Sequence, residues 1–287
     1  MRIIRSRVMG FCSGVKRGVD LLEEGIRLGA EKKLPVYTIG PLIHNEEFLR
    51  FAQQQGVRVI DSPGDAPPGI AVVRAHGIPR ALGDAFLSRG FILLDGTCIR
   101  VHRSQRLVEQ YSSEGSTVVI AGDAGHGEVI SLVGYAHPPG KCYVVKVPRD
   151  AADIPFHGKV LLLAQTTFSK SQYEAVRDEL ALHGKAYGIT YLEVIDSICP
   201  ATKSRQQALE ELTGVVDAVI VVGGKHSANT VRLFERSRLL GKPSWLISGA
   251  DEVTREMKQF DVIGLTAGAS TPDWVIDYVV RQLEKEE

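Results

Sequence analysis

Residues 2–26, RIIRSRVMGFCSGVKRGVDLLEEGI, contain the pattern that decides the fold. The stretch begins with an apolar, β-branched run that is typical of a strand. It continues as an amphipathic segment, which places four apolar residues on one helix face: Val15, Val19, Leu22 and Ile26. A strand followed directly by a helix is the unit from which parallel sheets are built.

The same alternation runs along the rest of the chain. Further strand-like runs are PVYTIG at 35–40, IAVVRA at 70–75, FILLDG at 91–96, STVVIAG at 116–122, CYVVKV at 142–147, KVLLLAQ at 159–165, YLEVIDS at 191–197, AVIVVGG at 218–224, PSWLIS at 243–248 and VIGLTAG at 262–268. Helical patterns lie between many of them, as in residues 171–184, 204–216 and 273–286. Near-continuous apolar strands suit sheets that are covered on both faces, so the sequence predicts an α/β fold with mostly parallel sheets.

Composition excludes several classes of protein. The chain has 34 Lys and Arg against 34 Asp and Glu, a net charge of zero, which argues against a general nucleic-acid binder or a polybasic membrane-surface protein. No apolar run approaches the roughly 20 residues that span a bilayer, and no signal-peptide pattern opens the chain. We therefore expect a soluble, cytoplasmic protein.

Four cysteines, at positions 12, 98, 142 and 199, are too sparse for a disulfide-stapled scaffold. Three of them share one context: GFC, DGTC and DSIC each follow a strand-like run and precede a helical one. The fourth, Cys142, opens a strand-like run and is interpreted as a small core residue.

The repeated cysteine context also suggests the domain organisation. The three positions are separated by about 90 to 100 residues, the length of one compact α/β domain. The simplest interpretation is three similar units, 1–97, 98–195 and 196–287, each with one cysteine at the carboxyl end of a strand.

Ligands of parallel sheets gather at that edge, and a helix N-terminus there favours the thiolate that binds metal. Three soft thiolates favour an iron–sulfur cluster or zinc, and a cluster with three protein ligands leaves one iron open. The chain has no CxxC pair, however, so spacing alone also allows three buried structural cysteines.

Polar residues follow the other strand-like runs. They are His44, His76, His126, Glu128, Gln165, Thr166, Thr167, Ser227, Asn229 and Ser270. Imidazoles, hydroxyls, an amide and helix N-termini together bind a phosphate or diphosphate without much formal charge. Glu128, two residues from a histidine in a glycine-rich turn, is a candidate proton donor. The remaining histidines are interpreted as structural or surface residues: His102, His137, His157, His183 and His226.

Taken together, these motifs resemble the LytB/IspH family of 4-hydroxy-3-methylbut-2-enyl diphosphate reductases over essentially the whole chain. The matching motifs, in the family's order, are GFCSGV, HN at 44–45, AHG at 75–77, DGTC, GHGEV, AQTT, DSICPAT, SAN and TAGAST. Each is weak alone, and their combination is specific.

The resemblance implies an enzyme of isoprenoid biosynthesis with pseudo-threefold domains around one [4Fe–4S] cluster, held by Cys12, Cys98 and Cys199. It implies that the open iron binds the substrate hydroxyl, and that two electrons and two protons remove this oxygen as water to give isopentenyl or dimethylallyl diphosphate. It assigns proton donation to Glu128 with His126 near the proton path, and placement of the hydroxyl to Thr166. The implied diphosphate residues are His44, His76, His126, Ser227, Ala228, Asn229 and Ser270. A ferredoxin or flavodoxin is the implied electron donor.

Two positions depart from the family pattern. Gly127 stands where the family usually has proline, which predicts a looser loop around Glu128. Ala228 stands where a second serine is usual, which predicts somewhat weaker diphosphate binding by Ser227 and Asn229.

Two other functions remain open at the level of sequence. Three cysteines and an open iron also suit a redox-neutral iron–sulfur dehydratase or synthase, which would turn over without reductant. A non-catalytic iron–sulfur sensor would not need Glu128. The sequence does not determine the product ratio, the cluster potential or the oligomeric state.

Overall fold

The computed structural model describes residues 1–138, 140–156 and 158–285. The chain forms two compact units. Unit 1 combines Met1–Ile60 with Pro200–Glu287, and unit 2 is Asp61–Cys199.

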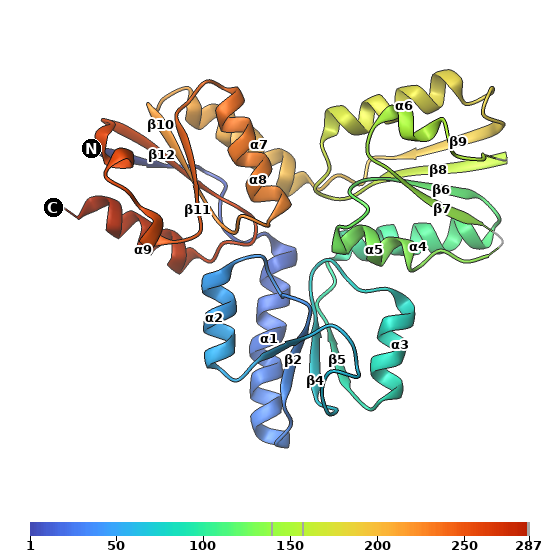
Figure 1. The fold of residues 1–287 in the computed structure, drawn as a ribbon, viewed down its shortest axis with the longest axis horizontal. Coiled ribbons are helices and arrows are strands. Elements are labelled where there is room, and N and C mark those ends of the chain that lie inside the picture. The colour runs from blue at the N-terminus through green and yellow to red at the C-terminus, as the bar shows by residue number, and fades with distance from the viewer. Residues whose placement is uncertain (139, 157, 286–287) are drawn as a thin grey trace. The chain divides into compact units, whose positions relative to one another are not determined.

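Unit 1 contains both ends of the chain (Figure 1). Its strands are β1 (Arg2–Arg5), β2 (Val36–Ile39), β3 (Arg58–Ile60), β10 (Ala218–Val222), β11 (Ser244–Ile247) and β12 (Val262–Ala267). Its helices are α1 (Ser13–Lys32), α2 (Glu46–Gln54), α7 (Pro200–Thr213), α8 (Ala228–Leu239) and α9 (Asp273–Glu284), with short 3₁₀ turns η2 (Ala250–Glu252) and η3 (Glu256–Gln259).

Unit 2 has the same alternation of strand and helix. Its strands are β4 (Ile70–Val73), β5 (Ile92–Asp95), β6 (Thr117–Ala121), β7 (Lys141–Val145), β8 (Gly158–Ala164) and β9 (Ile189–Ile195). Its helices are α3 (Arg80–Ser88), α4 (Ile99–Ser113), α5 (Gly127–Val133) and α6 (Lys170–His183), with the 3₁₀ turn η1 (Pro148–Ala151).

The strands form three four-stranded sheets, with the orders β1-β12-β10-β11, β3-β2-β4-β5 and β7-β6-β8-β9. Among the described residues, every strand pairing within either unit is parallel. The predicted α/β fold class with mostly parallel sheets is confirmed. The sequence analysis missed β3, because three residues with an exposed Arg58 and Val59 carry almost no hydrophobic pattern.

The division of the chain at residues 97/98 and 195/196 stays a prediction. The sheets do, however, join segments that are distant in sequence. Strand β1 pairs in register with β12, from Arg2 opposite Val262 to Arg5 opposite Leu265.

Alternate residues of β6 and β8 define the core of unit 2. Val119 and Leu162 point to the face that α6 covers, and they pack with Leu180. Their neighbours Ile120 and Leu161 point to the opposite face, which α4 and α5 cover. Figure 1 shows α6 on one side of this sheet and α4 and α5 on the other. The continuous apolar strands of the sequence therefore have the two covered faces that they predict.

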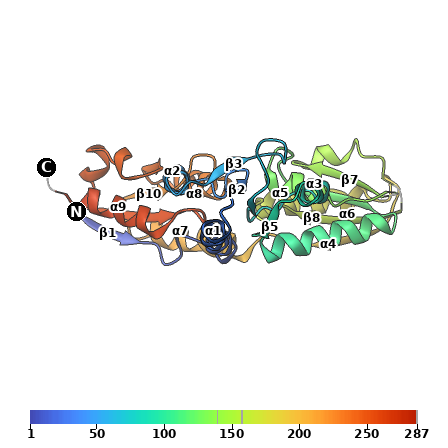
Figure 2. The same ribbon diagram turned by 90° about the horizontal axis from the view of Figure 1, so that it is seen from below.

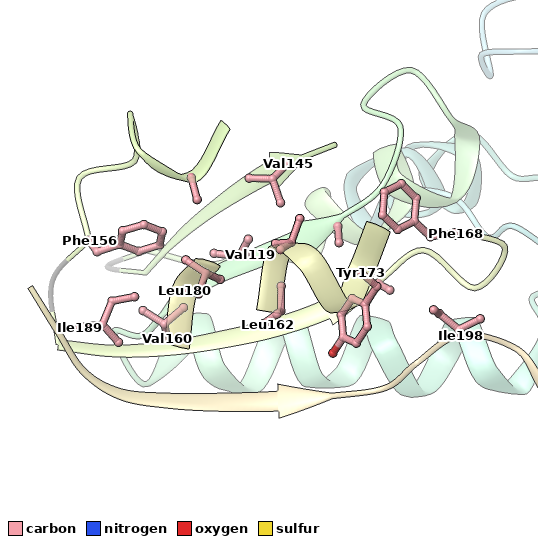
Figure 3. Packing of buried hydrophobic residues seen from close by; sticks show 14 residues of the cluster. Val119, Val145, Phe156, Val160, Leu162, Phe168, Tyr173, Leu180, Ile189 and Ile198 are labelled. Carbon is pink, nitrogen blue, oxygen red and sulfur yellow. The ribbon is translucent and has the colours of Figure 1, made fainter. Parts of the chain in front are cut away.

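One end of this core supports the functional residues. Phe168 and Ile198 belong to the same buried cluster as Val119 and Leu162 (Figure 3). Phe168 lies two positions after Thr166, and Ile198 directly precedes Cys199. Close packing of these two side chains restricts the backbone at both positions.

The sheet β1-β12-β10-β11 of unit 1 is also covered on both faces. Ile220 and Leu265 pack with Val279 of α9, whereas Val221 packs on the other side with Leu233 of α8. Within the described residues, no helix is long and apolar enough to span a membrane.

Helix α1 differs in detail from its prediction; Figure 2 views it along its axis. Leu22 is buried as predicted, but the other fully buried positions of α1 are glycines: Gly14, Gly18, Gly25 and Gly29. Val15, Val19 and Ile26 are only partly buried. Glycine lets a helix backbone approach its neighbours closely, so a stripe of small residues makes the contact that the apolar pattern assigned to the valines.

Candidate functional site

Three cysteines lie at helix starts, as the sequence predicts. Cys12 and Cys98 are the N-cap residues of α1 and α4, and Cys199 directly precedes α7. The Val15 backbone N–H donates to Cys12 Sγ at 3.4 Å. Gly10, in the turn before Cys12, has a φ of 75°, and its carbonyl accepts a 2.6 Å hydrogen bond from the buried Arg205 guanidinium.

The turns before Cys98 and Cys199 have the same construction. Asp95 Oδ1 accepts the Thr97 N–H at 2.9 Å, and Asp196 Oδ1 accepts the Ile198 N–H at 3.1 Å. These are Asx turns, in which the carboxylate shapes the backbone two residues ahead. Sequence reasoning missed the role of both aspartates, although the repeated D-x-x-C spacing of DGTC and DSIC is a signal for it.

Glu128 is a buried carboxylate held by a single residue. It lies in the first turn of α5, and its side chain is 1% exposed. Thr166, after the end of β8, donates its backbone N–H to Glu128 Oε1 and its hydroxyl to Oε2, both at 2.6 Å. The structure therefore brings together the predicted acid and the predicted hydroxyl-placing residue. Both hydrogen bonds favour the carboxylate form and fix its orientation.

The same threonine is joined to a cysteine. The Cys199 backbone N–H donates to the Thr166 carbonyl at 2.8 Å. Nearby, the Ser197 hydroxyl accepts the Ala164 N–H at 2.7 Å and donates to the Ala164 carbonyl at 2.6 Å. Ser197 was not predicted to have a role, and it ties the segment before Cys199 to the end of β8.

His126 and His76 continue this network. His126 Nδ1 accepts the Glu128 backbone N–H at 3.2 Å as the N-cap of α5, so Nε2 carries the hydrogen of the neutral ring. The His126 and His76 rings meet edge to face with centroids 4.9 Å apart. The Cys98 backbone N–H donates to the Ala75 carbonyl, the residue before His76, at 3.0 Å. Unit 2 thus links six predicted site residues by short contacts: Cys98, His76, His126, Glu128, Thr166 and Cys199.

Gln165 and Thr167, also predicted at this edge, have supporting contacts. Gln165 Nε2 donates to Thr167 Oγ1 at 2.8 Å, and Gln165 Oε1 accepts the Asp123 N–H at 3.0 Å. The fully buried Gln165 therefore holds the turn that leads to His126.

A second group of predicted residues gathers in unit 1. The Cys12 N–H donates to the Ala269 carbonyl at 3.2 Å, and the next residue, Ser270, donates its hydroxyl to Ser227 Oγ at 3.2 Å. Ser227 is the N-cap of α8 but makes no side-chain capping bond. The Nδ2 of Asn229 is buried and has no hydrogen-bond partner among the described residues. A buried donor without an acceptor is rare and marks a place that a ligand completes.

His44 belongs to the same part of unit 1. The loop after β10 passes so close to the His44 carbonyl that a Cβ on Gly224 would collide with it. Gly224 in turn accepts the Ser227 N–H at 3.0 Å. Only glycine allows this approach, which brings the backbone of His44 beside the start of α8.

Gly127 leaves room that another side chain fills. A Cβ on Gly127 would collide with a terminal nitrogen of Arg74 and would lie 3.0 Å from Arg74 Cζ. Arg74 directly follows β4 and was not identified from the sequence, because a single arginine after a strand carries no distinctive pattern.

The remaining cysteine and histidines are outside these clusters. Cys142 packs against the core of unit 2, and burial raises the pKa of its thiol to about 12, as expected for an inert core residue. His102, His137 and His183 each lie within 4.0 Å of a carboxylate at the surface, and His226 is exposed. His157 lies outside the described residues.

The donors fit a soft metal centre by their chemistry and placement. None of the four cysteines forms a disulfide. Three of them follow strands and begin helices, where the thiolate is favoured. Within residues 1–138, 140–156 and 158–285, no group of three or more His, Cys, Asp or Glu side chains is arranged to hold a single metal ion.

Comparisons with known proteins agree with this description. The model of the LytB protein family matches residues 3–284. A 4-hydroxy-3-methylbut-2-enyl diphosphate reductase of Treponema denticola is 44% identical and covers 99% of both chains. The solved structure of an (E)-4-hydroxy-3-methyl-but-2-enyl diphosphate reductase, described as the terminal enzyme of the non-mevalonate pathway, is 35% identical with a TM-score of 0.74, and the match covers 99% of both chains. The corresponding Plasmodium falciparum reductase is 28% identical with a TM-score of 0.87, over 99% of this chain and 88% of that one.

Three parallel sheets with a buried acid and polar residues at their strand ends define an α/β enzyme whose site lies at the carboxyl edge of its strands. Its members differ widely in chemistry, so the fold alone does not name one. The chain belongs to the LytB protein family. The predicted family is confirmed.

Proposed function

We propose that Glu128, Thr166 and His126 deliver a proton in the reductive dehydroxylation of (E)-4-hydroxy-3-methylbut-2-enyl diphosphate. The chain catalyses this reaction, in which two electrons and two protons break the allylic C–O bond. The oxygen leaves as water, and isopentenyl or dimethylallyl diphosphate is the product. Membership of the LytB protein family supports the activity.

One observation supports the role of Glu128 above all others. Thr166 binds both of its carboxylate oxygens, at 2.6 Å each, in a buried environment. A protonated Glu128 that donates its proton becomes a carboxylate, and the two Thr166 donors stabilise that product form. Because the donors are already in place, the transfer requires little reorganisation.

His126 and Thr166 position the acid and its surroundings. With Nδ1 engaged by the Glu128 N–H, His126 offers the N–H of Nε2 as a donor in its neutral form. Thr166 Oγ1 is bound to Glu128 Oε2 and retains a lone pair for the substrate hydroxyl or a water.

The diphosphate is bound by His44, His76, His126, Ser227, Asn229 and Ser270, with Ala228 at the same helix start. The buried Asn229 amide nitrogen and the Ser227–Ser270 hydroxyl pair support this role, because they offer donors rather than formal charge. The start of the 12-residue helix α8 adds backbone N–H groups that favour an anion.

Cys12, Cys98 and Cys199 hold one [4Fe–4S] cluster per chain. When bound, the cluster supplies electrons and an iron with an open coordination position that acts as a Lewis acid. A ferredoxin or flavodoxin in the cytoplasm supplies the electrons to the protein.

The test is an anaerobic assay with the diphosphate substrate and a strong reductant, on the wild type and Glu128→Gln. The amide cannot donate the proton, so we expect kcat to fall by about 10² to 10⁴-fold. Glu114→Gln, an exposed carboxylate in the same unit, is the matched control and should keep wild-type kcat. Full activity of Glu128→Gln would remove Glu128 from the mechanism.

The same assay separates the other functions. Turnover without reductant would indicate a redox-neutral dehydratase or synthase. A brown protein that converts no substrate with or without reductant would indicate a sensor. A colourless protein that contains zinc and no iron or acid-labile sulfide would exclude the cluster.

A further inference from the structure

The side chain of Arg74 is the one strongly basic group that packs directly against the acid-bearing turn. It follows the last residue of β4 and precedes His76 by two positions. Its guanidinium lies against Gly127, between His126 and Glu128 in sequence, where Cζ would be 3.0 Å from a Cβ. All of these residues belong to unit 2.

This guanidinium has no partner of its own within the part of the chain that the structure describes. Arg74 Nε is buried without a hydrogen-bond acceptor, and no ion pair neutralises the group. Desolvation lowers the pKa of Arg74 from its ordinary value, and the Asp61 carboxylate opposes this effect only through space. A partly desolvated cation without an anion is costly, so its retention requires a reason.

The surroundings indicate which anion completes it. Arg74 packs on the turn of His126, whose ring contacts His76, and both histidines are proposed diphosphate residues. Guanidinium is the side-chain group that best matches phosphate oxygens, because its planar fork donates two parallel hydrogen bonds. The substrate itself carries the required anion.

We propose that Arg74 is a further ligand of the substrate diphosphate, and that Gly127 is present because it leaves room for the guanidinium. The inference rests on the proposed function, since it adds a residue to the same diphosphate site. It also gives the glycine a purpose: the space that a proline or alanine would occupy holds a cation, which adds a charge where Ala228 lacks a hydroxyl.

The test measures binding of inorganic pyrophosphate to the anaerobically purified protein by titration calorimetry. Arg74→Gln removes the charge and keeps much of the side chain, and we expect the Kd to rise about 10 to 100-fold. The Kd should also depend less steeply on salt, because one cation is lost. Arg89→Gln removes an exposed arginine of the same unit and should change the Kd less than about twofold.

Turnover separates binding from a merely structural role. We expect Arg74→Gln to raise KM about as much as it raises the pyrophosphate Kd, with kcat within about threefold of wild type. Unchanged pyrophosphate binding and KM would overturn the proposal, whether or not kcat falls. If the wild type converts no substrate at all, the proposed function fails instead, so the two failures are distinguishable.

Gly127→Ala supplies a second, independent variant. Its Cβ would displace the guanidinium, so it should weaken pyrophosphate binding in the wild type but add little in the Arg74→Gln background. Additive effects of the two changes would contradict a shared role. Arg74→Lys, which keeps the charge without the fork, should bind pyrophosphate with intermediate affinity if Arg74→Gln fails to fold.

Discussion

The Glu128 region of unit 2 and the Ser227 region of unit 1 contain similar polar residues but use them differently. Around Glu128, both carboxylate oxygens are bound by Thr166, and the Thr166 carbonyl accepts the Cys199 N–H. Around Ser227, only the hydroxyl pair with Ser270 is formed, and the Asn229 amide nitrogen is buried without an acceptor. The first region is complete without a ligand, and the second is not.

This difference follows from what each region has to bind. A proton donor works best when its geometry is established before the reaction, because reorganisation then costs nothing at that moment. A site for an anion must keep donors available, and each buried donor without a partner destabilises the protein by about 1 to 3 kcal/mol. The structure therefore has rigidity in one region and unused binding capacity in the other.

Replacing a cluster cysteine should have the largest effect, and it tests whether both regions serve one cofactor. We expect Cys12→Ser in unit 1 to abolish activity as completely as Cys98→Ser or Cys199→Ser in unit 2, with loss of visible absorbance and of iron. Cys142→Ala is the control, since its buried thiol has a pKa of about 12 and is no ligand. Retention of iron and activity by any of the three serine variants would contradict the ligand assignment.

Thr166→Val opens the complete region by removing one of the two hydrogen bonds to Glu128. The backbone N–H bond remains, so we expect kcat to fall about 10 to 100-fold rather than to background, with little change in pyrophosphate affinity. Thr167→Val is the control, because its hydroxyl accepts only from Gln165. Equal kcat values for the two variants would show that the Glu128 contact is not what matters.

Asn229→Leu closes the incomplete region with an apolar group of similar shape. Because a buried donor without a partner is removed, the free energy of unfolding should rise by about 1 kcal/mol, while the pyrophosphate Kd rises about tenfold. Thr230→Val removes a neighbouring buried hydroxyl without a partner and should stabilise the protein without changing the Kd. Thermal unfolding and calorimetry measure the two effects, and a destabilised Asn229→Leu with normal binding would refute the comparison.

The smallest effect is expected from Ala228→Ser, which adds one donor to the incomplete region. The new hydroxyl should lower the pyrophosphate Kd by about three- to tenfold, the value of one additional hydrogen bond. Ala228→Gly, which adds no hydroxyl, should not tighten binding. Equal affinity in Ala228→Ser and the wild type would mean that Ser227 and Asn229 already satisfy the anion.

Local patterns predicted most of the fold. The runs at 116–122, 159–165 and 218–224 are strands because nearly every residue in them is apolar, and they are buried on both faces. Prediction failed where burial does not follow hydrophobicity: β3 is short and exposed, and α1 packs through glycines.

The chemistry of the site was predicted better than its connections. Cysteine, histidine and glutamate at strand ends are recognisable because residue type and position each point to a ligand or an acid. That Arg74 fills the space above Gly127 could not be predicted, because the two residues are distant in sequence and share no pattern.

The sequence by itself determined the parallel α/β class, the helix starts at three cysteines and the identity of the candidate acid, since these depend on local spacing and side-chain chemistry. Only the tertiary structure decided that Thr166 binds both oxygens of Glu128 and supports Cys199, and that Arg74 packs on Gly127. Hydrogen bonds require donor and acceptor within about 3 Å, and packing decides which distant strand ends come that close.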